Sequence, residues 1–229
     1  APADGVARDM TAYRQGVKGQ VRVMASVSSI TESLPDDIAS FLKQPEHAQI
    51  RVDIEERNSA DLVAALREGL APVGVCWDAA DMEGLQTKPY RGDELSVVVH
   101  PEHPLAGRKY CTLAQTLDHE HVGLPANTAV HTMLARAAAI IGKPIFYRAV
   151  VSTFDASLRC VMAGLGLAVV PRQIAEMAGD RGRMKVVALR EPWAKRRFAI
   201  CYRDYGQLSP AARLLVDHLS ALARGGKGG

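Results

Sequence analysis

Three short polar turns each stand directly before an apolar stretch with helical spacing. Their hydroxyl and amide side chains are Ser26, Ser28, Ser29, Asn127, Thr128, Ser152 and Thr153. Such side chains accept hydrogen bonds from the first backbone N–H groups of a helix, and the same N–H groups attract an anion. Three such turns converging on one cleft would form a site for an anion or another polar ligand. Each hydroxyl could instead be a helix cap that never meets a ligand.

Two aromatic residues could cover the apolar part of such a ligand. Trp77 ends a short apolar stretch, and Phe154 follows the third polar turn directly. Ligand sites combine an apolar lining with a few placed polar groups. The sequence therefore predicts a small carboxylate or other small anion, with an apolar or aromatic body, as the ligand.

Patterns for metal binding, cofactor binding and catalysis are weak. His119 and His121 would share one face of a strand while Glu120 points away, so we interpret this segment as a surface strand entry without a metal. Gly164 and Gly166 follow a helix and precede a strand, which is the reverse of the order in a dinucleotide-binding loop. A GxSxG nucleophile elbow is missing. We therefore expect no catalytic residue, metal or cofactor, and no enzyme activity.

The third turn opens a helix that leads directly into a strand. Asp155 adds a carboxylate to the first helical turn, and apolar residues then recur at helical spacing as far as Gly166. Residues 167–170 form an uninterrupted apolar run that Pro171 ends. A strand that is apolar on both faces is typical of a parallel sheet covered by helices. In such sheets, ligands bind beyond the carboxyl ends of the strands.

Strands and helices alternate along the rest of the chain. The expected strands span residues 20–24, 50–54, 73–77, 94–100, 121–124, 146–151, 167–170, 184–189 and 198–202. One of the helices between them is expected to start at a capping box formed by Ser29 and Glu32. This alternation predicts the α/β class.

The composition is that of an ordinary globular protein: 229 residues, 48% hydrophobic and 23% charged, with a formal net charge of +3. No stretch is apolar for long enough to span a membrane, and the first residues lack the core of a signal peptide, so a cytoplasmic location is expected. The basic run Lys195, Arg196 and Arg197 is interpreted as a solvated strand entry and not as a nucleic-acid site. The four scattered cysteines are expected to be reduced thiols.

Four segments carry a resemblance to a known family. They are GQVRVMAS at residues 19–26, LPDDIASF at 34–41, PEHPLAGR at 101–108 and VMAGLGLAVVP at 161–171. In this order and spacing they resemble the effector-binding domain of LysR-type transcriptional regulators, and the likeness covers nearly all of the chain from Gly19 onward. One departure is Pro72, where the family pattern usually has an aspartate before the third strand.

The resemblance implies a two-lobed α/β fold like that of type 2 periplasmic binding proteins, each lobe a mixed sheet flanked by helices. Lobe I would be residues 19–100 with 193–223, and lobe II residues 101–192. Residues 1–18 would be the end of a linker helix, and residues 224–229 a disordered tail.

The resemblance also places effector contacts in the polar turns already described. Matched by position, the three groups of contacts are Ser26, Ser28 and Ser29, then Asn127 and Thr128, and then Ser152, Thr153 and Phe154. The implied function is a small-molecule effector-sensing and dimerising domain of a bacterial regulator, as a dimer or, at full length, a tetramer. Its DNA-binding winged helix would lie outside this chain, so DNA would be bound only through that missing domain.

An alternative with the same fold and cleft is a stand-alone solute-binding protein for a small organic anion. The two hypotheses differ in what precedes the domain. An apolar stripe formed by Val6, Met10, Tyr13 and Val17 is typical of the end of a dimerising helix and favours the regulator.

Overall fold

The computed structural model describes residues 17–179 and 182–225, and its contacts divide the chain into two units. Unit 1 holds the described residues up to Arg91 and those from Arg197 onward, and unit 2 runs from Gly92 to Arg196. The predicted crossings near His100 and Trp193 therefore lie inside unit 2. Most of the predicted linker-helix end and of the predicted tail falls outside the described residues.

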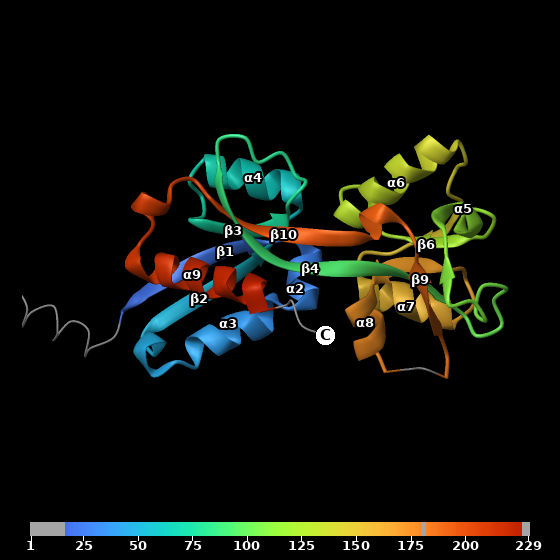
Figure 1. Ribbon diagram of the computed structural model, residues 1–229, viewed down its shortest axis with the longest axis horizontal. Helices are drawn as coiled ribbons and strands as arrows, with labels where there is room; N and C mark the ends of the chain where they lie inside the picture. The colour runs from blue at the N-terminus through green and yellow to red at the C-terminus, as the bar shows by residue number, and fades with distance from the viewer. Residues whose placement is uncertain (1–16, 180–181, 226–229) are drawn as a thin grey trace, which may run out of the picture. The chain divides into compact units, whose positions relative to one another are not determined.

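Unit 1 is built on a sheet whose first three strands are parallel (Figure 1). The order is β2 (Ile50–Glu56), β1 (Gly19–Ala25), β3 (Val73–Trp77), β10 (Lys195–Tyr202) and β4 (Gln86–Val99). Ala25, the last residue of β1, is level with Glu56 of β2 and Val75 of β3. The carboxyl ends of these strands therefore meet at one edge of the sheet, where the chain continues into helices.

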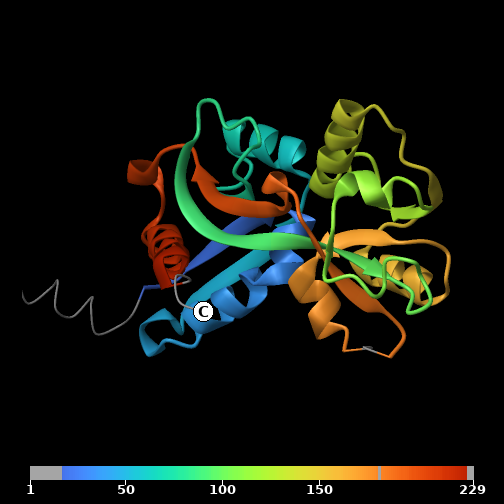
Figure 2. The same cartoon turned by 45° about the vertical axis from the view of Figure 1, so that its right-hand side comes forward.

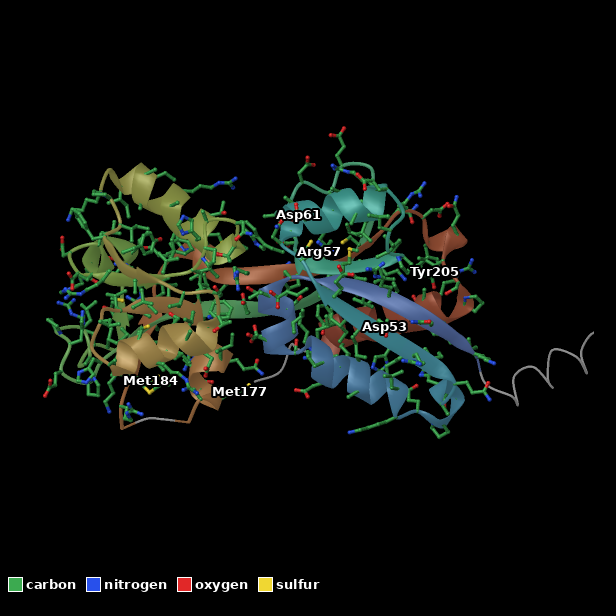
Figure 3. All side chains as sticks on the ribbon, turned by 180° about the vertical axis from the view of Figure 1, so that it is seen from behind. Asp53, Arg57, Asp61, Met177, Met184 and Tyr205 are labelled. Carbon is green, nitrogen blue, oxygen red and sulfur yellow. The ribbon has the colours of Figure 1, made fainter. Side chains whose placement is uncertain are left out.

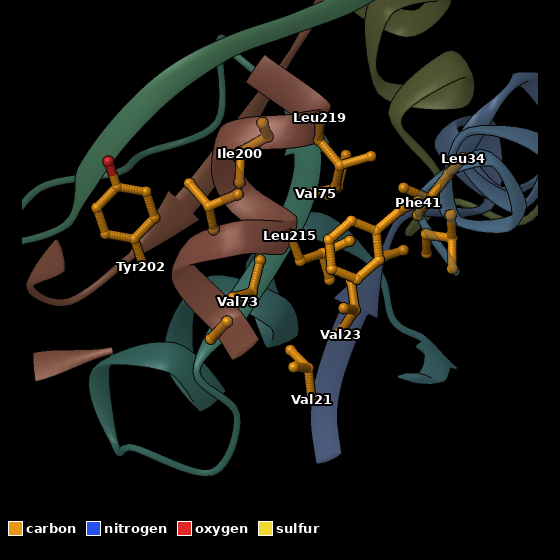
Figure 4. Close-up of a cluster of buried hydrophobic side chains, with 14 of the residues drawn as sticks. Val21, Val23, Leu34, Phe41, Val73, Val75, Ile200, Tyr202, Leu215 and Leu219 are labelled. Atoms are coloured by element: carbon orange, nitrogen blue, oxygen red, sulfur yellow. The ribbon is translucent and has the colours of Figure 1, made fainter. Parts of the chain in front are cut away.

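Helices cover both faces of this sheet, as the two views in Figures 1 and 2 show. The helices of unit 1 are α2 (Val27–Glu32), α3 (Leu34–Leu42), α4 (Ser59–Arg67) and α9 (Pro210–Gly225), with short 3-10 turns at Pro45–His47 and Tyr205–Gln207. Phe41 of α3 and Leu215 of α9 pack on Val21, Val23 and Val75 at one face (Figure 4).

The other face of the same sheet packs against α4. Leu62 and Leu66 of this helix pack there with Met24 of β1. A Cβ atom on Gly74 of β3 would lie 2.7 Å from the methyl groups of both leucines. Gly74 therefore allows α4 its close approach to the strands.

Unit 2 has its own mixed arrangement of strands and helices. Strand β9 (Lys185–Leu189) lies between β4 and β5 (Tyr110–Cys111), β8 (Ala168–Pro171) also pairs with β4, and β6 (His121–Gly123) pairs in parallel with β7 (Tyr147–Val150). The helices are α5 (Leu113–Thr116), α6 (Ala129–Ile141), α7 (Phe154–Met162) and α8 (Arg172–Met177), with a 3-10 turn at Pro192–Ala194. The sequence analysis missed β5 and α8, which are both short.

The predicted pairing of β8 is wrong. All four residues of β8 are buried, as expected, but the strand runs antiparallel to β4, with Leu95 opposite Pro171. The parallel partner is limited to a single bridge between Leu167 and His121 of β6. Burial on both faces follows from the covering helices, and it does not reveal in which direction a neighbouring strand runs.

The basic run at the start of β10 is only partly solvated, which corrects its interpretation. Lys195 and Arg197 are exposed, whereas Arg196 is buried and its side chain forms an ion pair with the equally buried Asp93 of β4. Arg196 Nε donates to Asp93 Oδ1 over 2.7 Å. Successive side chains of a strand point to opposite faces, so the middle residue of the three faces inward.

We expect the packing of α9 on the sheet to be a major source of stability in unit 1. Leu215 is 0% exposed whereas its neighbour Leu214 is 36% exposed. Leu215→Ala should lower the free energy of unfolding by about 2 to 5 kcal/mol because it leaves a cavity. The matched change Leu214→Ala should cost about 1 kcal/mol or less. Urea denaturation followed by circular dichroism measures both, and equal losses would contradict the packing described.

Candidate functional site

The serine turn after β1 is held together by hydrogen bonds among its own residues. Ser26 is the N-cap of α2, and its Oγ accepts from the backbone N–H of Ser29 over 3.4 Å. The Ser29 hydroxyl lies 2.9 Å from the carbonyl oxygen of Ser26 and 3.3 Å from that of Val75. The predicted capping box of Ser29 and Glu32 is therefore wrong, because both residues lie inside α2 and Ser26 caps it.

Ser28 differs from the other two serines of this turn. Its side chain is buried, with 6% of the residue exposed, and within the described part of the chain its hydroxyl has no hydrogen-bond partner. The residue is mostly buried, but its hydroxyl oxygen is not among the fully buried polar atoms that lack a partner, so a ligand can reach it. Of the three predicted serines, Ser28 is thus the one whose hydroxyl is available to a ligand.

A cation that the sequence analysis missed lies at the same edge of the sheet. The backbone N–H of Arg57, directly after β2, donates to the carbonyl oxygen of Ala25 over 3.0 Å, which places Arg57 beside the start of the serine turn (Figure 3). The next residue, Asn58, caps α4 and accepts from the N–H of Asp61 over 2.9 Å. The signal in the sequence was a strand ending in a basic residue followed by a helix cap.

Two arginines at this edge of the sheet share one carboxylate. Arg57 Nε donates to Glu55 Oε1 over 2.8 Å, and Arg22 Nε donates to Glu55 Oε2 over 3.0 Å. The hydrogen bonds from Arg22 and Arg57 lower the pKa of the Glu55 carboxyl group. Two guanidinium groups thus share one carboxylate, and Arg57 is 47% exposed and open to a second anion.

Trp77 ends β3 at this edge and is half-buried. It is paired with Phe198 of β10, and the N–H of the next residue, Asp78, donates to the carbonyl oxygen of Arg197 over 3.0 Å. The backbone of Trp77 is therefore held by the sheet, and part of its side chain stays accessible, which suits the predicted apolar lining.

In unit 2, the side chains of Thr128 and His131 hold the turn before α6 through polar contacts with its backbone. Thr128 is the N-cap, and its hydroxyl donates to the Pro125 carbonyl oxygen over 2.8 Å while accepting from the His131 N–H over 3.3 Å. His131 Nδ1 lies 3.1 Å from the carbonyl oxygen of Leu124. The Thr128 hydroxyl hydrogen is thus already used within the turn, whereas the side chain of Asn127 is exposed.

The third predicted turn, before α7, holds one cap, one exposed hydroxyl and one core residue. Thr153 is the N-cap and accepts from the N–H of Ala156 over 3.1 Å, and Ser152 is exposed. Phe154 is 3% exposed and belongs to the core of unit 2. Its ring therefore offers little surface to a ligand, and Ser152 is the open side chain of this group.

The segment with two histidines does not lie at the surface as expected. His121 is 1% exposed, Glu120 forms an ion pair with Arg148, and the ring of His119 lies 4.5 Å from that of His103. Burial, and to a smaller extent the nearby His119 and His103, lower the pKa of His121 to about 4. Within the described residues, no three histidine, cysteine or acidic side chains are grouped to hold a metal.

The four cysteines are free thiols, three of them buried and Cys160 half-buried. Burial raises the pKa of Cys111 to about 11, and that of Cys201 is raised by its contact with Cys76 and by burial. Thiols of this kind react slowly because the thiolate is the nucleophile. The chemistry that the geometry offers is thus reversible binding through hydroxyl groups, a guanidinium group and helix starts.

Comparisons with known proteins place the chain among transcriptional regulators. The profile of the LysR substrate binding domain matches residues 14–224. A RuBisCO operon transcriptional regulator of Allochromatium vinosum is 24% identical over 217 residues, which are 90% of this chain and 68% of that relative. CysL, a transcriptional regulator of Bacillus subtilis, is 22% identical over 166 residues, or 72% of this chain and 55% of CysL.

Solved structures share the fold. The effector-binding domain of QuiR in complex with shikimate superposes with a TM-score of 0.80 at 18% identity, covering 92% of this chain and 99% of that one. The BenM effector-binding domain with its effector benzoate gives a TM-score of 0.77 at 21% identity, covering 93% and 96%. The α/β fold predicted from the sequence is thereby confirmed.

In residues 17–179 and 182–225, no helix has the length and apolar character that a membrane crossing requires.

The buried neutral His121 makes stability depend on pH. An unfolded chain binds a proton to histidine near pH 6.5, whereas the folded chain does so only near pH 4. Stability is therefore complete above about pH 6.5 and is lost as the pH falls towards 4, by about 3 kcal/mol in all. His121→Asn should remove most of this loss, and His218→Asn in unit 1 should not. Urea denaturation between pH 7.5 and 4.5 measures it, and identical pH curves for His121→Asn and the parent would refute the assignment.

Proposed function

The chain belongs to the LysR substrate-binding domain family and is the effector-binding domain of a LysR-type transcriptional regulator, and from this premise we propose that its effector is a small organic anion. In unit 1 the anion would be bound by Ser28 and Arg57. The start of α6 in unit 2 is proposed separately as a helix start that can bind an anion. The observation that carries this proposal is that one sheet edge holds both Ser28, whose hydroxyl has no hydrogen-bond partner among the described residues, and the accessible guanidinium group of Arg57.

Each group has a distinct role in this proposal. Arg57 supplies a charge-assisted hydrogen bond to a carboxylate or phosphate, and Ser28 donates one hydroxyl hydrogen. At the start of α6, the first backbone N–H groups are donors and Asn127 is an exposed amide, while Thr128 holds the turn in place. Trp77 covers an apolar part of the effector. Ser26 and Thr153 act as helix caps, and the Ser29 hydroxyl holds the serine turn through the Ser26 and Val75 carbonyl oxygens.

Two solved neighbours support an anion as the effector. The QuiR domain was solved with shikimate and the BenM domain with benzoate, and both molecules carry a carboxylate. Shikimate has a hydroxylated ring and benzoate an aromatic one, so the body of the effector differs between relatives. For this chain we propose a carboxylate with a ring small enough to contact Trp77.

The family consists of transcriptional regulators, and we propose that this domain senses and does not catalyse. The chain spans 68% of the Allochromatium relative and 55% of CysL. DNA binding is therefore proposed for a part of the full-length regulator outside this chain, and the cytoplasm is proposed as its location. The solute-binding alternative has less support, because the matched relatives are regulators.

We also propose that the domain forms a dimer, with strand β7 of unit 2 at the interface. Within the described residues, one edge of strand β7 in unit 2 is unpaired. Exposed apolar side chains lie on this strand and directly before it. Phe146 is 66% exposed and Val150 is 58% exposed. An exposed strand edge with apolar side chains favours association with another chain.

The anion proposal predicts that Ser28→Ala and Arg57→Gln each weaken carboxylate binding by about 1 to 3 kcal/mol, because each removes a hydrogen bond that a buried ligand requires. A thermal-shift screen that includes shikimate and benzoate finds a ligand, and calorimetry measures its affinity. Ser40→Ala removes a hydroxyl from the outer side of α3 and serves as the control. Unchanged affinity in both variants would overturn the proposed placement.

A second prediction tests whether the Thr128 hydroxyl supports binding by holding the turn before α6. Thr128→Val removes the hydroxyl that holds the turn before α6, so affinity should fall by about 1 to 3 kcal/mol. Thr128→Ser keeps the hydroxyl and should restore most of the affinity. If the serine variant binds as poorly as the valine variant, the hydroxyl group has no part in binding.

The dimer proposal predicts a charge-sensitive contact at β7. Val150→Lys should shift the chain towards monomer in sedimentation velocity, because burying an unpaired ammonium group at an apolar interface is unfavourable. Leu70→Lys is the control, since Leu70 is 56% exposed and lies in unit 1. A parent chain that sediments as a monomer at all concentrations tested would contradict the proposal.

A further inference from the structure

A hollow of about 410 Å³ lies within unit 2, along helix α6, apart from the residues assigned to the effector. One side of it is formed by Ala135, Ala138 and Ala139, which are three and four positions apart and therefore share one face of the helix. Their side chains are only methyl groups, so a flat molecule can lie close to the helix. Volumes of this size hold small ligands in other proteins.

The segment that follows α6 also lines the hollow. Gly142 ends the helix with a φ of +77°, a left-handed conformation that turns the chain back. Pro144 and Ile145 follow and line the hollow. The lining is thus mostly apolar: Pro144 contributes a rigid ring, and the three alanines contribute methyl groups.

Two stacked rings close the end near the start of α6. The imidazole of His131 and the phenol of Tyr147 lie 5.5 Å apart between centroids, with 21° between their planes, and both line the hollow. The Tyr147 hydroxyl oxygen is buried and has no hydrogen-bond partner among the described residues. Burial raises the pKa of this phenol, so the hydroxyl stays protonated and is a donor.

A cation stands at the other end of the hollow. Lys143 lines it, and its ammonium group lies 2.9 Å from a carboxylate oxygen of Asp118. Both side chains are at least half exposed, so this ion pair is weak. An ammonium group has three N–H donors, and two remain for another anion.

We propose that this hollow is a second small-molecule site, and that it takes an aromatic carboxylate. The ring would lie between the alanine methyl groups and Pro144, and the carboxylate would face Lys143. The rings at the far end favour an aromatic body because ring edges and faces attract each other. An apolar body with one anionic group matches the apolar sides and the cation at the end of the hollow.

Residues of the hollow also contact the segment that leads into the turn before α6. The consequence for effector affinity rests on the proposed function. His131 Nδ1 is in contact with the Leu124 carbonyl oxygen, and Tyr147 packs so tightly on Gly123 that a Cβ atom there would lie 2.5 Å from the ring. A molecule that moves either ring would therefore move the residues leading into the turn. We expect occupation of the hollow to change effector affinity.

The direct test uses 2-naphthoate as the probe and the chain labelled at alanine methyl groups. Titration should produce saturable NMR shifts at Ala135, Ala138 and Ala139. Ala139→Leu fills the hollow from an exposed helix position and should weaken binding at least tenfold, whereas Ala137→Leu, on the same helix but outside the hollow, should not. Melting temperatures of both variants check that each is folded.

Two further comparisons test the chemistry at the ends. Tyr147→Phe keeps the ring that lines the hollow and should change 2-naphthoate affinity less than twofold, because the hydroxyl oxygen is buried and the carboxylate faces Lys143 at the other end. Replacing the probe by neutral 2-naphthamide should weaken binding severalfold, because Lys143 then meets no negative charge. Equal affinity for the two probes would overturn the assignment of an anion.

The same experiment must distinguish binding of the probe in the hollow from binding at the effector site. A chain carrying Ser28→Ala and Arg57→Gln should keep the 2-naphthoate shifts at the alanine stripe, even where it has lost carboxylate binding elsewhere. If these shifts vanish in that variant, or persist unchanged in Ala139→Leu, the probe occupies the effector site alone and the second site is refuted. Absence of saturable shifts at millimolar probe would refute it as well.

Discussion

The buried ion pair between Asp93 and Arg196 is the interaction on which the rest of the structure depends. The two residues stand where β4 enters unit 2 and where β10 leaves it, and both side chains are 0% exposed. Removing one partner of such a pair leaves an isolated buried charge, which costs about 3 to 5 kcal/mol. On the unit 1 side, Asp37 of α3 accepts hydrogen bonds from Arg91 Nε and Nη2 over 2.7 and 2.9 Å. Strand β4 is thus anchored on both sides of Gly92.

At the carboxyl edge of unit 1, the serine turn is connected to β10 through β3. Strand β10 pairs with β3, and β3 supplies the Val75 carbonyl oxygen that accepts from the Ser26 N–H over 2.9 Å. The serine turn is therefore tied to the sheet and not left as a free loop. A turn held in this way keeps its donors oriented before a ligand arrives, which lowers the ordering cost of binding.

Charge at the site is a local property in this chain. A formal net charge of +3 spread over 229 residues has little bearing on which ligand binds. What matters is that Arg22 and Arg57 share Glu55, so that one guanidinium group is left with unused hydrogen-bonding capacity at the sheet edge. The same reasoning applies at Lys143, whose single exposed partner does not exhaust its donors.

By itself, the sequence determined the α/β class and the positions of most strands and helices, because apolar periodicity and capping residues act over a few neighbouring positions. The family was indicated by a different signal, the resemblance of four short segments in their order and spacing. The sequence also located the turns that begin α6 and α7. Only the tertiary structure decided that β8 runs antiparallel to β4, that Arg196 is buried, and that Ser28 is unpartnered while Ser29 is not. Strand direction, burial of a charge and the partners of a hydroxyl depend on residues far apart in the chain, such as Val75 for Ser29 and Asp93 for Arg196. Local patterns carry no information about those partners, because they are brought together only when the sheets and helices pack.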